Sequence, residues 1–199
     1  MSGLAGVLAI AFTMVFTENY VLVQFLGICP FLGVSQKLSS SLGMSGAVIF
    51  VMTLASAVTY LIYTYIMVPL GLAYLSTIIF ILVIAALVQF VEIFLKRFVH
   101  PLYSALGIYL PLITTNCAVL AVTLLNISEN YNLLESCVDG FAVGVGFGLA
   151  LVLFSGVRKA LERAKPPACW NGLPITLVAA ALTSMTFMGF TGIADNLFG

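Results

Sequence analysis

The chain has 199 residues, of which 62% are hydrophobic and 7% are charged, and its formal net charge is zero. Soluble domains carry roughly 25% charged residues, so this chain has too few to cover a water-exposed surface and must have lipid as its main solvent. The balanced charge gives nucleic acid binding no electrostatic support. We therefore expect an integral membrane protein with one domain, residues 1–199.

Six hydrophobic segments are long enough to cross a bilayer, which requires about 20 apolar residues per helix. They cover residues 4–36, 44–66, 70–95, 101–126, 136–157 and 173–194, with polar or turn residues between them. The first segment is too long for one simple crossing and contains Glu18, Asn19, Cys29 and Pro30. The pattern predicts an all-α membrane protein with six transmembrane helices.

The basic residues predict the orientation of these helices. All seven lie in the first, third and fifth connections: Lys37, Lys96, Arg97, Arg158, Lys159, Arg163 and Lys165. With six crossings these connections share one side, which the positive-inside rule assigns to the cytoplasm. Both termini are then expected outside, in the periplasm or the extracellular space.

Three crossings in each half reverse the direction of the chain, so we expect two inverted repeats, residues 1–97 and 98–199. Such repeats commonly place broken helices near the middle of the bilayer. Helices 1 and 4 are the candidates. Gly27 and Pro30 flank Cys29, while Pro111, Thr114, Thr115 and Asn116 precede Cys117.

The two cysteines are expected at similar depths. Cys29 lies eight residues before Lys37, and Cys117 lies nine residues before Asn126. These spacings correspond to roughly 12–14 Å of helix, about half of a ~30 Å hydrocarbon core. The two segments leave the membrane on opposite faces, so both thiols should reach the middle.

Several interpretations of this pair remain open at this point. A single cysteine in a membrane helix is most often a small hydrophobic residue. A disulfide has no obvious purpose at this depth, and zinc sites of the structural type are rare in lipid and would find no histidine there. Thiolates also bind iron, and a [2Fe–2S] cluster takes four of them. Cys137 and Cys169 lie near opposite membrane faces and are expected to be incidental.

Other polar and small residues in the segments have ordinary interpretations. We expect Glu18, Glu92 and Asp139 to lie near the membrane interfaces, although an acidic residue inside a span is always a functional candidate. Gly140, Gly144 and Gly148 repeat every four residues, which predicts close packing of the fifth helix against a neighbour.

Five stretches of the chain resemble a known family of membrane proteins. They are FLGICPFLGVSQKL (25–38), VMTLAS (51–56), FILVIAALVQFVE (80–92), LGIYLPLITTNCAVLAVTLLN (106–126) and FMGFTG (187–192). The chain is similar over nearly its whole length to the family shared by Rnf electron-transport complexes and the sodium-pumping NADH:quinone reductase. The two cysteine motifs are closest to the A type.

This resemblance implies a role in an ion-translocating ferredoxin:NAD oxidoreductase of the prokaryotic cell membrane, which moves Na⁺ or H⁺. It also implies that Cys29 and Cys117 are iron ligands of one [2Fe–2S] cluster, shared with a paralogous E-type subunit that supplies two further cysteines. The other expected partners are the B, C, D and G subunits and the lipid bilayer. No catalytic residue and no complete active site are expected on this chain.

Two other functions are compatible with the residues alone. Broken helices in inverted repeats also occur in secondary transporters that work without partners. A passive membrane anchor for redox enzymes would have the same hydropathy. Iron in the purified complex would favour the electron-transfer role over the first alternative, and loss of electron transfer in cysteine variants would exclude the second.

Overall fold

The computed structural model describes residues 10–35, 38–71, 73–98, 112–113, 115–163, 170 and 172–198. These residues form helices and connecting turns, and they contain no strand, which confirms the all-α prediction for this part of the chain. The elements are η1 (Thr13–Thr17), α2 (Ile28–Val34), α3 (Leu38–Ile62), η2 (Tyr63–Met67), α4 (Val68–Leu70), η3 (Ala73–Leu75), α5 (Ser76–Phe98), α8 (Cys117–Ser128), α9 (Leu133–Arg163) and α10 (Leu173–Phe198).

Three helical stretches in these ranges are long and apolar enough to cross a membrane: Leu38–Leu70, Ser76–Phe94 and Leu133–Leu161. Two shorter apolar helices cover Cys117–Ser128 and Leu173–Gly189. The structure thus supports a membrane protein, whereas six complete crossings and the repeat boundaries stay predictions.

Helix boundaries differ from those expected where polar residues continue a helix. α3 begins at Leu38 rather than at residue 44, and α9 extends from Leu133 to Arg163 rather than over 136–157. A helix can continue beyond the lipid because its own backbone hydrogen bonds remain satisfied. Helical structure continues to Leu70, beyond the expected end at residue 66, and Gly71 with φ +66° ends α4 in a left-handed conformation.

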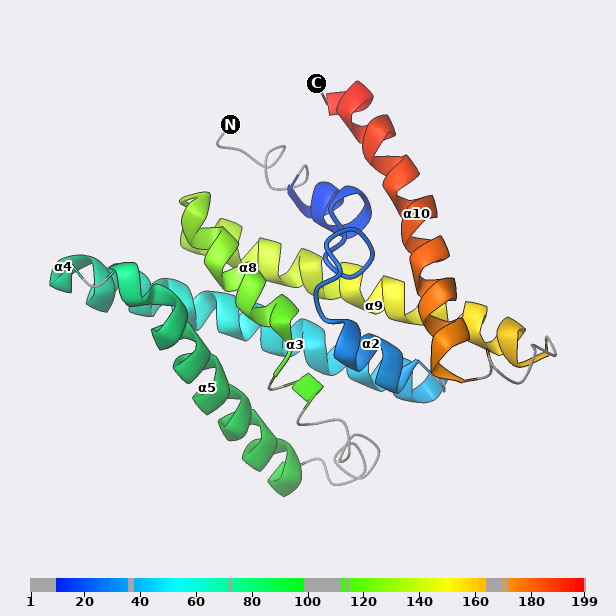
Figure 1. Ribbon diagram of the computed structural model, residues 1–199. Helices are drawn as coiled ribbons and strands as arrows, with labels where there is room; N and C mark the ends of the chain where they lie inside the picture. The colour runs from blue at the N-terminus through cyan, green and yellow to red at the C-terminus, as the bar shows by residue number, and fades with distance from the viewer. Residues whose placement is uncertain are drawn as a thin grey trace.

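The centre of the fold is the seam between α3 and α9, which lie side by side (Figure 1). A β-carbon built on Gly144 would lie 2.8 Å from Cα of Ile49, so these backbones meet directly. One turn away on either side, Gly140 faces Ser56 and Gly148 faces Ser45. The predicted glycine packing surface is confirmed, and its neighbour is α3.

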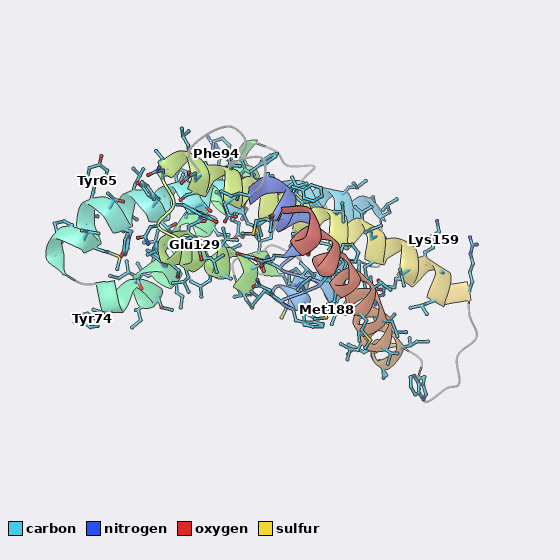
Figure 2. The ribbon with its side chains drawn as sticks, turned by 90° about the horizontal axis from the view of Figure 1, so that it is seen from above. Tyr65, Tyr74, Phe94, Glu129, Lys159 and Met188 are labelled. Carbon is cyan, nitrogen blue, oxygen red and sulfur yellow. The ribbon has the colours of Figure 1, made fainter. Side chains whose placement is uncertain are left out.

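α5 and α10 extend away from opposite sides of this central pair (Figure 1). Both carry large exposed apolar side chains, including Leu82 and Phe90 on α5 and Met185 on α10. Seen from above, Lys159 lies at the opposite end of the molecule from Tyr65 and Tyr74 (Figure 2).

Candidate functional site

The first hydrophobic segment is interrupted over residues 18–27. The π-helix η1 ends at Thr17, and regular helix resumes only at Ile28. Phe25 and Gly27 both have positive φ, +56° and +79°. The predicted break in the first helix therefore exists, but Pro30 does not cause it. Pro30 lies buried in the first turn of α2, where its missing N–H has no intrahelical partner to lose.

Asn19 satisfies several backbone groups of this interruption. Its side-chain amide donates to the carbonyl of Gly146 on α9 at 2.8 Å and to that of Val15 at 3.2 Å. Its side-chain oxygen accepts from the N–H groups of Val21 and Leu22, at 3.1 and 3.3 Å. Asn19 is fully buried. Non-helical backbone inside a membrane protein requires such internal partners.

Side chains from the second half of the chain hold the rest of the interrupted segment. The hydroxyl of Ser184 on α10 donates to the carbonyl of Leu22. Arg158 on α9 donates to the carbonyl of Leu32 at 2.6 Å and to the hydroxyl of Ser35 at 2.9 Å, at the end of α2. The sequence suggested no such role for Arg158 beyond its charge. The feature of the sequence that could have indicated this role is the position of Arg158 at the end of the apolar part of α9.

α2 also packs on α9 through an aromatic pair. The rings of Phe31 and Phe154 stack with their centroids 4.4 Å apart, and both side chains are buried. Such contacts contribute about 0.5–1.5 kcal/mol beyond the burial of their area. α2 is therefore held at its middle by the packing of Phe31 and at its end by Arg158.

The second cysteine segment is also interrupted. Leu112 and Ile113 are helical, Thr115 and Asn116 are not, and α8 begins at Cys117. Asn116 caps α8, because its side-chain oxygen accepts from the N–H of Ala118 at 3.1 Å. This confirms the predicted break just before Cys117. Pro111 and Thr114 lie outside the described residues.

The two interruptions meet. A β-carbon built on Gly27 would lie 2.9 Å from Oδ1 of Asn116 and 3.4 Å from Cβ of Ala118. Figure 1 shows α2 next to the start of α8. Cys29 is two residues beyond Gly27, and Cys117 lies between the two residues that Gly27 contacts. The tertiary structure thus places two cysteine-bearing helix starts side by side.

Both of these cysteines have free thiols and are exposed on the surface of the chain. Cys29 lies in the first turn of α2, and Cys117 is the first residue of α8. Cys137 is free and half-buried in the second turn of α9. Cys169 lies outside the described residues.

The Cys, His, Asp and Glu side chains of the described residues can supply at most part of an iron site. Among the described residues, no group of three or more Cys, His, Asp and Glu side chains is placed to hold a metal ion. A [2Fe–2S] cluster takes four protein ligands. Two exposed free thiols at neighbouring helix starts fit half of such a ligand set.

The three acidic residues of the spans have different environments. Glu18 is exposed and Glu92 is half-buried. The chain between Glu18 and Cys29 is not a continuous helix. Asp139 is fully buried inside the protein, and its expected depth near a membrane interface stays a prediction. α3 and α8 cover α9 there, and hydropathy alone did not reveal this cover.

Comparison with known proteins gives a consistent set of matches. A profile of the family described as "Rnf-Nqr subunit, membrane protein" matches residues 7–194. The A-type component of the "Ion-translocating oxidoreductase complex" of Aliivibrio salmonicida is 54% identical over 179 residues, 90% of this chain and 93% of that protein. The corresponding component from Shewanella sediminis is 53% identical over 186 residues, 94% of this chain and 97% of its own length.

A further relative comes from Acetobacterium woodii. It is the A-type component of a "Na(+)-translocating ferredoxin:NAD(+) oxidoreductase complex" and is 52% identical over 184 residues, 92% of this chain and 96% of that protein. All these matches extend over nearly the full length of both chains.

Proposed function

Because this chain belongs to the Rnf-Nqr family of membrane proteins, we propose that it is the A-type component of an ion-translocating ferredoxin:NAD oxidoreductase. In this proposal it relays electrons through a [2Fe–2S] cluster inside the membrane, and the electron flow is coupled to translocation of Na⁺ or H⁺. The named relatives support the complex and its ion transport.

The contact between Gly27 and the start of α8 is the observation that carries the electron-relay role. It brings together the two helix starts that carry these cysteines, which are 88 residues apart in the sequence. Free thiols exposed on a membrane-embedded surface have few uses, and cluster ligation requires them to be unpaired and accessible to a partner.

Cys29 and Cys117 would hold one side of the cluster. When bound, a [2Fe–2S] cluster accepts one electron and passes it on. The first turns of α2 and α8 contain backbone N–H groups without partners inside the helix, and such groups can hydrogen-bond to sulfur. Asn116 caps the start of α8, Asn19 holds the interrupted backbone before α2, and Arg158 holds the end of α2.

The two missing ligands would come from a paralogous E-type subunit with a similar pair of cysteines. The remaining partners are the B, C, D and G subunits of the complex and the lipid bilayer. Soluble electron donors and acceptors would bind those other subunits. The exposed surface around the two thiols is the expected contact with the E-type subunit.

The arrangement of helices supports two inverted repeats and a defined orientation. α2, α3 and α5 in the first half correspond in order and relative length to α8, α9 and α10 in the second. α5 and α10 leave opposite sides of the central pair, as an inverted arrangement requires (Figure 1). With the end carrying Lys159 in the cytoplasm, both termini lie outside. A reporter fused after Gly199 should be found outside, and one within residues 164–169 in the cytoplasm.

Cysteine variants of the assembled complex test the electron-relay role. Cys29→Ser and Cys117→Ser should each remove or damage the cluster and stop electron transfer, since a serine oxygen binds this soft site poorly. Iron content and the electron paramagnetic resonance signal of the reduced complex are the measurements. Cys137→Ser is the matched control and should leave both unchanged. Full iron content and activity in Cys117→Ser would contradict the proposal.

A further inference from the structure

A groove on the surface of the molecule lies between α10 on one side and the interrupted first segment with α2 on the other. Its wall on α10 is one helical face, in which residues follow at intervals of three and four: Leu177, Ala180, Ala181 and Ser184. The two alanines are small and leave the hollow open. Its volume is about 80 Å³, several times the space that one water molecule requires, so several methylene groups fit inside.

The lining of this groove is apolar. The wall opposite α10 includes the side chains of Phe25, Ile28 and Phe31. Of the described residues that line the groove, Ser184 alone has a polar side chain, and its hydroxyl donates to the carbonyl of Leu22. A polar ligand would therefore lose its hydrogen bonds to water without finding a donor here, whereas a hydrocarbon chain loses nothing. The groove is suited to hydrocarbon.

One face of α2 connects this groove to the side chain of Arg158. Ile28 and Phe31 line the groove, and Ser35 follows them on the same face, since the three are spaced at i, i+3 and i+7. Nη1 of Arg158 donates to the hydroxyl of Ser35 at 2.9 Å and to the carbonyl of Leu32 at 2.6 Å. The guanidinium thus lies at the end of α2, roughly 6–10 Å along the helix from the groove residues.

The guanidinium of Arg158 can bind an anion at this place. Its side chain is half-buried, and both described partners of its Nη1 are uncharged. No described carboxylate pairs with it, and a partly buried charge is stabilised by a counter-charge. Residues 158–165 contain four basic side chains and one acidic one, a net charge of +3. Because a guanidinium binds phosphate through two parallel N–H groups, Nε and Nη2 suit a phosphate oxyanion.

We propose that the groove and Arg158 together bind one anionic phospholipid, such as phosphatidylglycerol, with its phosphate at the guanidinium and one acyl chain in the groove. A free phosphate ion would leave the groove empty. An apolar helix of a neighbouring subunit would fill the groove but would bring no anion to Arg158. A phospholipid provides both parts in one molecule, and basic pockets at the cytoplasmic side of membrane proteins commonly bind anionic headgroups.

This lipid site is separate from the proposed cluster ligands and goes beyond the electron-relay role, because neither Cys29 nor Cys117 lines the groove. The bound acyl chain would cover the ring of Phe25, which is 51% exposed and has φ +56°. It would also pack against α2, which has only seven residues and depends on its neighbours for stability. The phospholipid is therefore expected to hold the interrupted segment in place.

The test uses the intact complex in phosphatidylcholine vesicles with a trace of a photoactivatable lipid that carries a diazirine in the middle of one acyl chain. A phosphatidylglycerol probe is compared with a phosphatidylcholine probe that has the same chains. After illumination, mass spectrometry locates the label. Labelling within residues 21–31 and 177–184 should be at least about fivefold stronger with phosphatidylglycerol, as expected for one favourable charge contact.

Two variants separate the groove from the headgroup site. Ala181→Phe fills the groove and should reduce labelling of these residues to background, while Ala86→Phe adds the same ring at an exposed position of α5 outside the groove and should leave it unchanged. Arg158→Gln should remove about fivefold of the preference for phosphatidylglycerol. Its control is Arg97→Gln in the last turn of α5, which should retain the preference.

The unmodified complex already decides whether the site exists. Equal labelling by the two probes would overturn the proposal, and so would absence of label from both stretches, the result expected if a neighbouring subunit covers the groove. This comparison stands even where a variant does not assemble. Undiminished labelling in an assembled Ala181→Phe complex would also overturn the proposal. The iron content of Ala181→Phe should equal that of the unmodified complex, so failure of the lipid site is distinguishable from failure of the cluster assignment.

Discussion

The seam between α3 and α9 and the interrupted segments beside it are stabilised by different interactions. At the seam both helices are continuous, and glycines allow their backbones to approach directly, as Gly144 does at Ile49. Around residues 18–27 the helix is lost, and side chains from distant positions bind the freed backbone groups. Close backbone packing stabilises the seam, and hydrogen bonds stabilise the interrupted segments. Different substitutions should therefore disrupt the two regions.

Gly144→Ile should produce the largest loss. The new β-carbon would lie only 2.8 Å from Cα of Ile49. The helices α3 and α9 must therefore separate, at a cost of about 3 kcal/mol. The measurement is the yield of intact complex in mild detergent and its midpoint of thermal dissociation. Gly156→Ile is the matched control on the same helix, where no atom lies within 4 Å of the added β-carbon. Normal assembly of Gly144→Ile would show that the seam is not tightly packed.

Asn19→Ala tests the polar region and should rank second. It leaves the N–H groups of Val21 and Leu22 and the carbonyl of Gly146 without their partner. We expect a loss of about 2.5 kcal/mol, from several bonds that are individually modest in membranes. The midpoint of thermal dissociation is again the measurement. Asn19→Asp keeps the acceptor but has no N–H for the carbonyls of Gly146 and Val15, which its carboxylate would face, so it should lose at least as much. A smaller loss in Asn19→Asp would contradict this account.

Gly27→Ala tests the contact between the two interruptions. An alanine must adopt φ +79° and place its β-carbon 2.9 Å from Oδ1 of Asn116, which should cost about 2 kcal/mol and lower the iron content of the complex. Gly71→Ala is the control, because Gly71 has φ +66° with open space around it. It should cost only about 1 kcal/mol and retain iron. If the two variants lose equally, the contact with Asn116 contributes nothing.

Asn116→Ala should have the smallest effect of the four. It removes the cap of α8, which is worth about 1 kcal/mol, and no distant backbone group depends on it. Asn116→Ser retains a capping oxygen and should recover most of the thermal midpoint. A loss as large as that of Asn19→Ala would mean that the second interruption also depends on distant contacts.

Predictions that rested on hydropathy and short spacings are confirmed by the structure. The all-α class follows from the long apolar segments, and the packing of Gly140, Gly144 and Gly148 follows from their four-residue repeat. The break before Cys117 was marked by Asn116, a residue with a strong preference for helix starts. These properties are local, so a linear sequence reports them directly.

The sequence analysis misjudged the role of Pro30 and did not predict the contacts of Arg158. Pro30 had the residue type of a helix breaker, but it occupies a first turn where proline is tolerated. The pairing of Arg158 with the end of α2 joins positions more than 120 residues apart. Nothing in the local pattern around Arg158 indicates that partner.

By itself, the sequence determined that lipid surrounds this protein and that Cys29 and Cys117 are the notable thiols, because apolar content and residue type are properties of each segment alone. Only the tertiary structure decided that their helix starts meet at Gly27 and that Asp139 is buried. Contact and burial depend on which helices cover a residue. That cover is set by the packing of α3, α8 and α9 together, since no single helix can bury its own side chains.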